Sequence, residues 1–185
     1  MTNSILAGVL IGMGGVAYVT EGGIAGAFLF SVGLMAVLIL KADLYTGKVC
    51  FRNNYNSKLM VIFAGNLIGA IIMGLVTSGF VDTYMICQNK LSEPFLWLPR
   101  SILCGMFIAV AVRSWERIRS EIIVILSVMG FILTGSEHVI ANIYYLAVAK
   151  SFSLKAVLFI IVCLIGNTIG GYIMAFLIEK NLKKE

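Results

Sequence analysis

Apolar runs of membrane-spanning length are the feature that most constrains how this chain folds. A helix that crosses a hydrocarbon core about 30 Å thick needs about 20 predominantly apolar residues. Six such runs lie near residues 3–20, 24–42, 58–80, 95–112, 121–148 and 155–178. Because unpaired backbone groups cannot face lipid, each run is predicted to be α-helical wherever it touches the bilayer. We therefore expect an all-α integral membrane protein whose main partner is the lipid bilayer.

The composition excludes a soluble globular domain. Hydrophobic residues make up 60% of the 185 residues and charged residues 12%, whereas about a quarter of an ordinary soluble domain is charged. No basic residue precedes the first run, so we expect it to be retained rather than cleaved as a signal. Cys50, Cys87, Cys104 and Cys163 form no CxxC pair, and we interpret them as buried apolar residues rather than metal ligands. We predict no cofactor.

The basic residues predict the orientation of the chain. When the loops are assigned alternately to two sides, Lys90, Lys150 and Lys155 fall on one side. The other side collects Lys48, Arg52, Lys58, Arg113, Arg117, Arg119, Lys180, Lys183 and Lys184. The richer side is predicted to be cytoplasmic, which places both termini there in a multi-pass protein of the cell membrane. The net charge of +5 is then explained by topology, without a nucleic-acid partner.

Two stretches resemble each other and indicate an internal repeat. GNLIGAIIM at 65–73 and GNTIGGYIM at 166–174 each carry two glycines at GxxxG spacing, which allows another backbone to approach closely. A chance match of apolar residues is the alternative. We predict one transmembrane domain over 1–185 with halves at about 1–82 and 90–180. Three spans in each half would make the second half inverted relative to the first.

Inverted halves predict a functional site in mid-membrane, where a helix of each half is interrupted. In the second half, Thr134-Gly135-Ser136 is predicted to break the fifth run, with Ser136 or Thr134 capping the helix that resumes. In the first half, KADLYTGKVCFRN is predicted to break the second run near Gly47.

Several polar residues near the breaks have both a functional and a structural interpretation. His138 is the only histidine, and an ionisable group inside a span usually faces a cavity, although it could instead bond a backbone carbonyl. Glu137 could cap free amides, Asp43 could be neutralised by a nearby lysine, and Lys90 could be a surface charge. We assign six residues to the support of the broken helices: Asp43, Asn66, Ser136, Glu137, Asn142 and Asn167.

Several motifs together resemble the formate/nitrite transporter family, which includes hydrosulfide channels. They are FSVGL (30–34), ADLYTG (42–47), GNLIGA (65–70), RSILCG (100–105) and GSEHVIAN (135–142). The resemblance implies a homopentamer of aquaporin-like protomers, each with its own pore and six transmembrane helices, of which the second and fifth are broken. It also implies that Thr46 and His138 meet at the pore centre and that Lys90 attracts anions outside. The implied constrictions are Phe30, Leu34, Leu44, Tyr45 and Phe131, which composition alone would assign to packing.

The function that follows is a channel for small monovalent anions of weak acids such as formate, nitrite or hydrosulfide. A bare ion is costly in an apolar constriction, so we expect the substrate to cross the centre as the neutral acid. The proton would come from the vestibule or from His138, or His138 would stay neutral and bond Thr46. The alternative is an aquaporin-type pore for neutral solutes, which the missing Asn-Pro-Ala motifs disfavour. An enzyme is not expected, because no nucleophile motif or metal-ligand set accompanies the single histidine.

Overall fold

The computed structural model describes residues 1–51 and 58–182, and these residues form helices and turns without a strand. The helices are α1 (Thr2–Glu21), α2 (Gly23–Ile39), α3 (Tyr45–Lys48), α4 (Leu59–Thr77), α5 (Tyr84–Ser92), α6 (Pro94–Ile118), α7 (Glu121–Leu133), α8 (Val139–Val148) and α9 (Leu154–Leu182). Three residues of the predicted cytoplasmic set, Arg52, Lys183 and Lys184, lie outside the described residues.

Four of the described helices, α1, α4, α6 and α9, are long and apolar enough to cross a membrane. The other two predicted runs are shorter in the structure. The run at 24–42 contains α2, which has 17 residues, and the run at 121–148 is divided into α7 and α8. The predicted interruption at Gly135 is therefore present, with the chain leaving helical geometry between Leu133 and Val139.

The interruption in the first half lies earlier than predicted. α2 ends at Ile39, and the chain turns at Leu40 to Leu44 before the single turn of α3, so Thr46 and Gly47 belong to a helix and not to the break. The residue in the left-handed conformation at this turn is Lys41, with φ 53°, so no glycine marks the turn in the sequence.

The two interruptions nevertheless have the same backbone geometry. Leu40 and Thr134, which end α2 and α7, both have φ −81° and ψ 0°, and each is followed by a left-handed residue, Lys41 or Gly135. The amides two residues after these ends then donate back into the helix that has just ended. Ala42 bonds the Val37 carbonyl and Ser136 bonds the Phe131 carbonyl, both at 2.9 Å.

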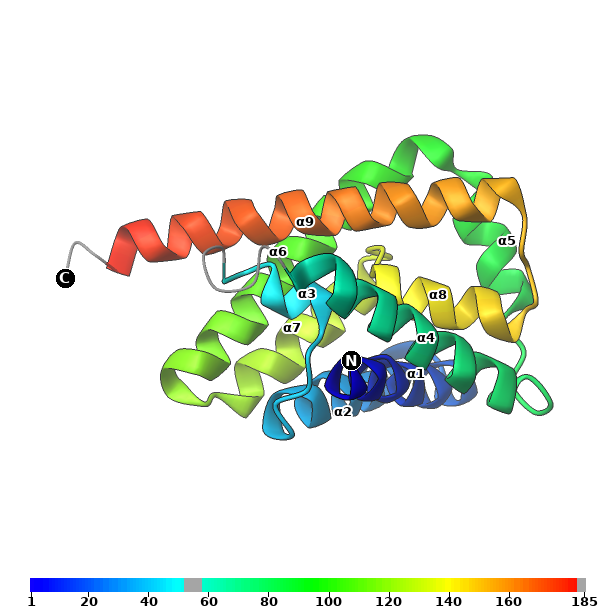
Figure 1. Ribbon diagram of the computed structural model, residues 1–185, viewed down its shortest axis with the longest axis horizontal. Helices are drawn as coiled ribbons and strands as arrows, with labels where there is room; N and C mark the ends of the chain where they lie inside the picture. The colour runs from blue at the N-terminus through cyan, green and yellow to red at the C-terminus, as the bar shows by residue number, and fades with distance from the viewer. Residues whose placement is uncertain (52–57, 183–185) are drawn as a thin grey trace.

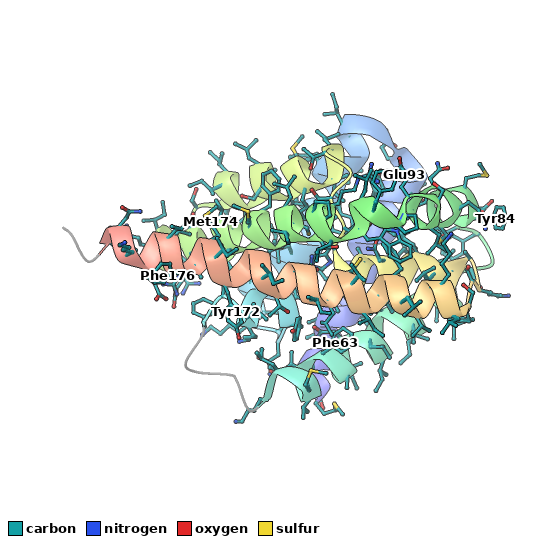
Figure 2. All side chains as sticks on the ribbon, turned by 90° about the horizontal axis from the view of Figure 1, so that it is seen from above. Phe63, Tyr84, Glu93, Tyr172, Met174 and Phe176 are labelled. Atoms are coloured by element: carbon teal, nitrogen blue, oxygen red, sulfur yellow. The ribbon has the colours of Figure 1, made fainter. Side chains whose placement is uncertain are left out.

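The helices form an elongated bundle in which α9 runs along one face (Figure 1). At one end of the molecule lie α5 and the connection from α8 to α9, and at the other lie the turn from α6 to α7 and the end of α9. The short helix α8 lies inside the bundle, and all ten of its residues are buried. The described outer surface carries apolar side chains such as Phe176 on α9 and Tyr84 on α5, seen in Figure 2.

The repeated glycine motifs place two helix pairs in close contact. Gly65 and Gly69 of α4 lie against the backbone of α1 near Ser4 and Ile5. Gly166 and Gly170 of α9 lie in the same way against α6, near Ser101 and Ile102. A Cβ atom at any of the four glycines would collide with the neighbouring helix, so the motifs set how closely these helices pack. All four cysteines are also buried.

We expect Gly170→Ala to lower the thermal unfolding midpoint of the detergent-solubilised protein by several degrees. The added methyl would meet the Ile102 carbonyl of α6, which is rigid backbone, and overpacking of this kind costs about 1–3 kcal/mol. Gly79→Ala is the matched control, because a Cβ there meets no atom within 4 Å. Equal midpoints for the two variants would contradict the close packing of α6 and α9.

Candidate pore site

Asn66 of α4 ties the first interruption to its surroundings. Its Oδ1 accepts the amide of Tyr45 at 2.7 Å, which is the first residue of α3. Its Nδ2 donates to the carbonyl of Ser4 at 2.7 Å and to that of Asp43 at 2.8 Å. Asn66 is completely buried, and its one amide side chain satisfies three backbone groups.

Asn167 of α9 does the same for the second interruption. Its Oδ1 accepts the amide of Val139, the first residue of α8, at 2.9 Å. Its Nδ2 donates to the carbonyls of Ser101 and Glu137, both at 2.8 Å. The two asparagines therefore make corresponding bonds to the break, to the helix that follows it and to a neighbouring helix.

The two helix starts held in this way bring Thr46 and His138 into contact. Thr46 Oγ1 lies 3.0 Å from His138 Nε2, although the residues are 92 positions apart. Thr46 is 1% exposed and His138 is 2% exposed. The hydroxyl and the imidazole thus form an enclosed polar pair between the two interruptions.

The hydrogen bond at the second ring nitrogen of His138 determines which tautomer the imidazole adopts. Nδ1 accepts the backbone amide of Ala141 at 3.2 Å, which makes His138 the side-chain cap of α8. A neutral ring that accepts at Nδ1 carries its proton on Nε2 and donates it to Thr46. The expectation that Ser136 or Thr134 caps this helix is wrong. Their hydroxyls lie 2.8 Å apart and bond each other, while His138 occupies the cap position.

Aromatic rings cover the polar pair. The Phe131 ring stacks on the His138 imidazole at 5.7 Å between centroids and 24° between planes. Phe30 meets Phe131 edge to face, also at 5.7 Å. Leu34 and Leu44 are 1% exposed and belong to the same buried cluster as the two phenylalanines.

Two cavities lie near this group. The larger, about 410 Å³, is bounded by Leu34 and Leu44 and extends to Lys41, Lys48 and Arg119. The smaller, about 70 Å³, is bounded by Phe131 and His138 and extends to Lys90 and Tyr145. Three of the five predicted constriction residues, Leu34, Leu44 and Phe131, thus line one of the two cavities, and the fourth, Phe30, contacts Phe131. We call the larger cavity the inner cavity and the smaller one the outer cavity.

Tyr45 lies elsewhere. Its ring packs against Phe63 at 5.5 Å and its hydroxyl lies 2.8 Å from that of Thr168. It is absent from the linings of both the inner and the outer cavity, and it belongs to a separate buried cluster beside α4 and α9. The structure therefore groups Tyr45 with the packing of α3 rather than with the other four residues.

Lys90 and Glu137 form an ion pair at the outer cavity. Lys90 Nζ lies 2.5 Å from Glu137 Oε2, and the Glu137 side chain is 1% exposed whereas that of Lys90 is 20% exposed. The same Oε2 accepts Asn142 Nδ2 at 2.9 Å. The carboxylate of Glu137 is therefore held by a lysine and an amide, and the pair adds little net charge to the cavity.

The remaining predicted support residue, Asp43, pairs with Lys48 at 3.0 Å at the inner side of the first interruption. Sequence reasoning missed Tyr18 and Tyr145, which line the outer cavity, and Arg119, which lines the inner one. Helical spacing from His138 would have pointed to Tyr145, because residues seven apart share a helix face. No comparable signal marks Tyr18 or Arg119.

A helical membrane protein with two interrupted helices, a buried polar pair between them and a cavity on either side has the architecture of a membrane transport protein. A sequence model described as formate/nitrite transporter matches residues 1–179. The chain belongs to the formate/nitrite transporter family, whose members are transporters or channels rather than enzymes.

Among its relatives is the uncharacterized transporter YrhG of Bacillus subtilis, 30% identical, with 83% of this chain and 69% of that protein aligned. The formate-nitrite transporter 2 of Toxoplasma gondii is 26% identical over 86% of this chain, which spans only 41% of the length of that protein. A structure described as a pentameric formate channel with formate bound has a TM-score of 0.84, at 22% identity, covering 100% of this chain and 96% of that one. An FNT family ion channel has a TM-score of 0.76, at 22% identity, covering 94% and 84%. Both of these structures have the same fold as this chain.

We expect Asn66→Ala and Asn167→Ala each to destabilise the protein by about 2 kcal/mol or more, because each leaves three buried backbone groups without a partner. The measurement is the thermal unfolding midpoint in detergent. Asn181→Ala is the control, since that exposed side chain makes one bond to the Leu177 carbonyl. An unchanged midpoint in both buried variants would refute the structural role of the asparagines.

Lys90→Met is expected to cost about 3 kcal/mol of stability, because it leaves the buried Glu137 carboxylate without its cation. The double variant Lys90→Met/Glu137→Gln should recover most of the loss, since it removes the stranded charge. The exposed Lys155 provides the control variant Lys155→Met. If the double variant is as unstable as the single one, the loss comes from packing and not from the charge.

Proposed function

We propose that this protein is a channel for small monovalent anions of weak acids, such as formate, nitrite or hydrosulfide. The observation that carries the proposal is the contact of Thr46 with His138 between the inner and outer cavities. A solute passing from one cavity to the other at this point meets one hydroxyl and one imidazole in otherwise apolar surroundings. Membership of the family and the fold shared with a formate channel support the substrate class.

We further propose that the substrate passes the centre as the neutral acid. Removing an anion from water without a compensating charge is far more costly than removing an uncharged polar molecule. The phenylalanine and leucine side chains around Thr46 and His138 supply no such charge. Lys90, which lines the outer cavity together with His138, is paired with Glu137; the pairing weakens its attraction for an anion but leaves it at the outer mouth.

His138 acts in this mechanism as a neutral hydrogen-bond donor. Its Nδ1 is engaged by the Ala141 amide, so adding a proton there would break the cap of α8. If Nε2–H donates to Thr46, the Thr46 hydroxyl hydrogen is free to be offered to the substrate. The proton that neutralises the substrate then comes from water in a cavity rather than from the imidazole.

The proposed architecture is six transmembrane helices in two inverted repeats, about 1–82 and 90–180, which assemble as a homopentamer. The matching geometry of the two interruptions and of Asn66 and Asn167 supports the repeat. The pentameric formate channel of the same fold supports the assembly. Lys41, Lys48 and Arg119 gather at the inner cavity, which supports a cell-membrane topology with that side, and both termini, in the cytoplasm.

Flux into proteoliposomes tests the function. External sodium formate is expected to acidify the lumen at least about tenfold faster than in protein-free liposomes. Thr46→Val should slow this about five- to tenfold through loss of one hydrogen bond. Thr168→Val is the control, because its hydroxyl bonds Tyr45 and Leu164 away from both cavities.

Potassium with valinomycin distinguishes the two forms of the substrate. Neutral-acid passage moves no net charge and releases a proton inside, so the acidification rate should not depend on valinomycin. Passage of the anion alone moves charge and brings no proton, so formate uptake would then need valinomycin and would not acidify the lumen. Nitrite and sulfide measured under the same conditions would rank the substrates. Liposomes with protein that pass none of the three would disprove the proposed function.

A further inference from the structure

The outer cavity contains two polar atoms that the protein leaves without a partner. Within the described part of the chain, the buried side-chain oxygens and nitrogens that make no hydrogen bond are Asn142 Oδ1 and the Tyr145 hydroxyl. Asn142 is 1% exposed and Tyr145 is 3% exposed, and both residues line the outer cavity. Buried polar atoms are nearly always bonded, so two unbonded ones beside one cavity mark a place where a small polar molecule can bind.

The two residues lie on one face of α8 with His138. Positions 138, 142 and 145 are four and three residues apart, which is the spacing of neighbours on a helix surface. Asn142 is fixed in orientation, because its Nδ2 donates to Glu137 and its carbonyl oxygen is thereby the free end. Tyr145 is fixed by packing against Tyr144 and Tyr18, with ring centroids at 5.5 and 6.4 Å.

The size of the outer cavity limits what it can hold. Its volume of about 70 Å³ is enough for a molecule of a few heavy atoms, since one water needs about 10–15 Å³ on this kind of measure. The Phe131 ring bounds the cavity on the side of the Thr46 and His138 pair. A molecule in the cavity would therefore wait immediately outside the proposed crossing point.

The charges around the cavity favour an uncharged ligand. The titratable groups that line it or lie beside its lining residues are Lys90, Glu137, His138, Tyr18, Tyr144, Cys87 and Cys163. The two charged members, Lys90 and Glu137, neutralise each other. Among the buried side-chain atoms of the described residues, one acceptor, the Asn142 carbonyl, and one hydroxyl, that of Tyr145, remain without a hydrogen-bond partner.

We propose that the outer cavity is a binding site for the undissociated form of the weak acid. The acidic hydrogen of the ligand donates to Asn142 Oδ1, and a lone pair of the ligand accepts the Tyr145 hydroxyl hydrogen. An anion could use the hydroxyl but would leave the Asn142 carbonyl facing negative charge. The inference rests on the proposed function and adds to it a site of selection, in which Tyr145 is a ligand-binding residue.

Ligand-induced stabilisation tests this site without measuring transport. The full-length protein in detergent is titrated with sodium formate, and its thermal unfolding midpoint is compared with that in sodium chloride at equal concentration. The unaltered protein should be stabilised by formate. Tyr145→Phe should need about tenfold more formate for the same shift, as expected for the loss of one hydrogen bond. Without formate its midpoint should be unchanged or higher, because the variant removes an unpartnered hydroxyl.

Tyr144→Phe is the matched control, since that neighbouring hydroxyl lies 3.3 Å from Thr77 and the residue does not line the outer cavity. It should respond to formate as the unaltered protein does. A pH series identifies the bound form. Lowering the pH by one unit at constant total formate raises the undissociated acid about tenfold, so about tenfold less formate should suffice.

Each remaining outcome overturns the inference. Equal responses of Tyr145→Phe and Tyr144→Phe would remove Tyr145 from the site, and a response independent of pH would show that the anion binds. If formate does not stabilise the unaltered protein, there is no site, while lumen acidification in the flux assay would leave the proposed function standing. If both formate stabilisation and flux are absent, the function and the site fail together.

Discussion

The structure depends on how it satisfies backbone groups where two helices stop inside an apolar environment. A buried amide or carbonyl without a partner costs about 1–3 kcal/mol, and each interruption exposes several of them. Asn66 and Asn167 meet this requirement with corresponding bonds, and the glycines beside them bring α4 and α9 close enough to α1 and α6 for those bonds to form. The contact between Thr46 and His138 follows, because the same asparagines fix the first residues of α3 and α8.

His138 connects the fold and the candidate site. One ring nitrogen caps α8 and the other meets Thr46, so the imidazole is held at both ends. Its orientation is further limited by the stacked Phe131 ring. The neutral tautomer is consequently part of the helix start, and any role that requires a protonated ring would have to disrupt local structure as well as overcome burial.

The general architecture could be predicted from the sequence because it follows from local patterns. Apolar runs, the glycine at 135 and the repeated Gly-Asn motifs located the helices, the second interruption and its asparagine support. Features that depend on tertiary contacts could not be located in this way. Ser136 is the better cap by propensity, yet His138 takes the position, and the Lys90 and Glu137 pair joins residues 47 positions apart. Helical spacing places Tyr145 on the face of His138, but that its buried hydroxyl has no partner among the described residues is a tertiary property that the spacing does not show.

The first interruption was misplaced for a related reason. A left-handed residue is usually glycine, and Gly135 has this role in the second half, whereas Lys41 has it in the first. A non-glycine residue with this backbone carries a conformational cost of about 1 kcal/mol, and Lys41 also lines the inner cavity. Backbone preference alone therefore does not account for a lysine at this turn. The two halves also differ in tolerance to change, because position 41 already accommodates a side chain with a Cβ atom, whereas any substitution of Gly135 would introduce strain that is now absent.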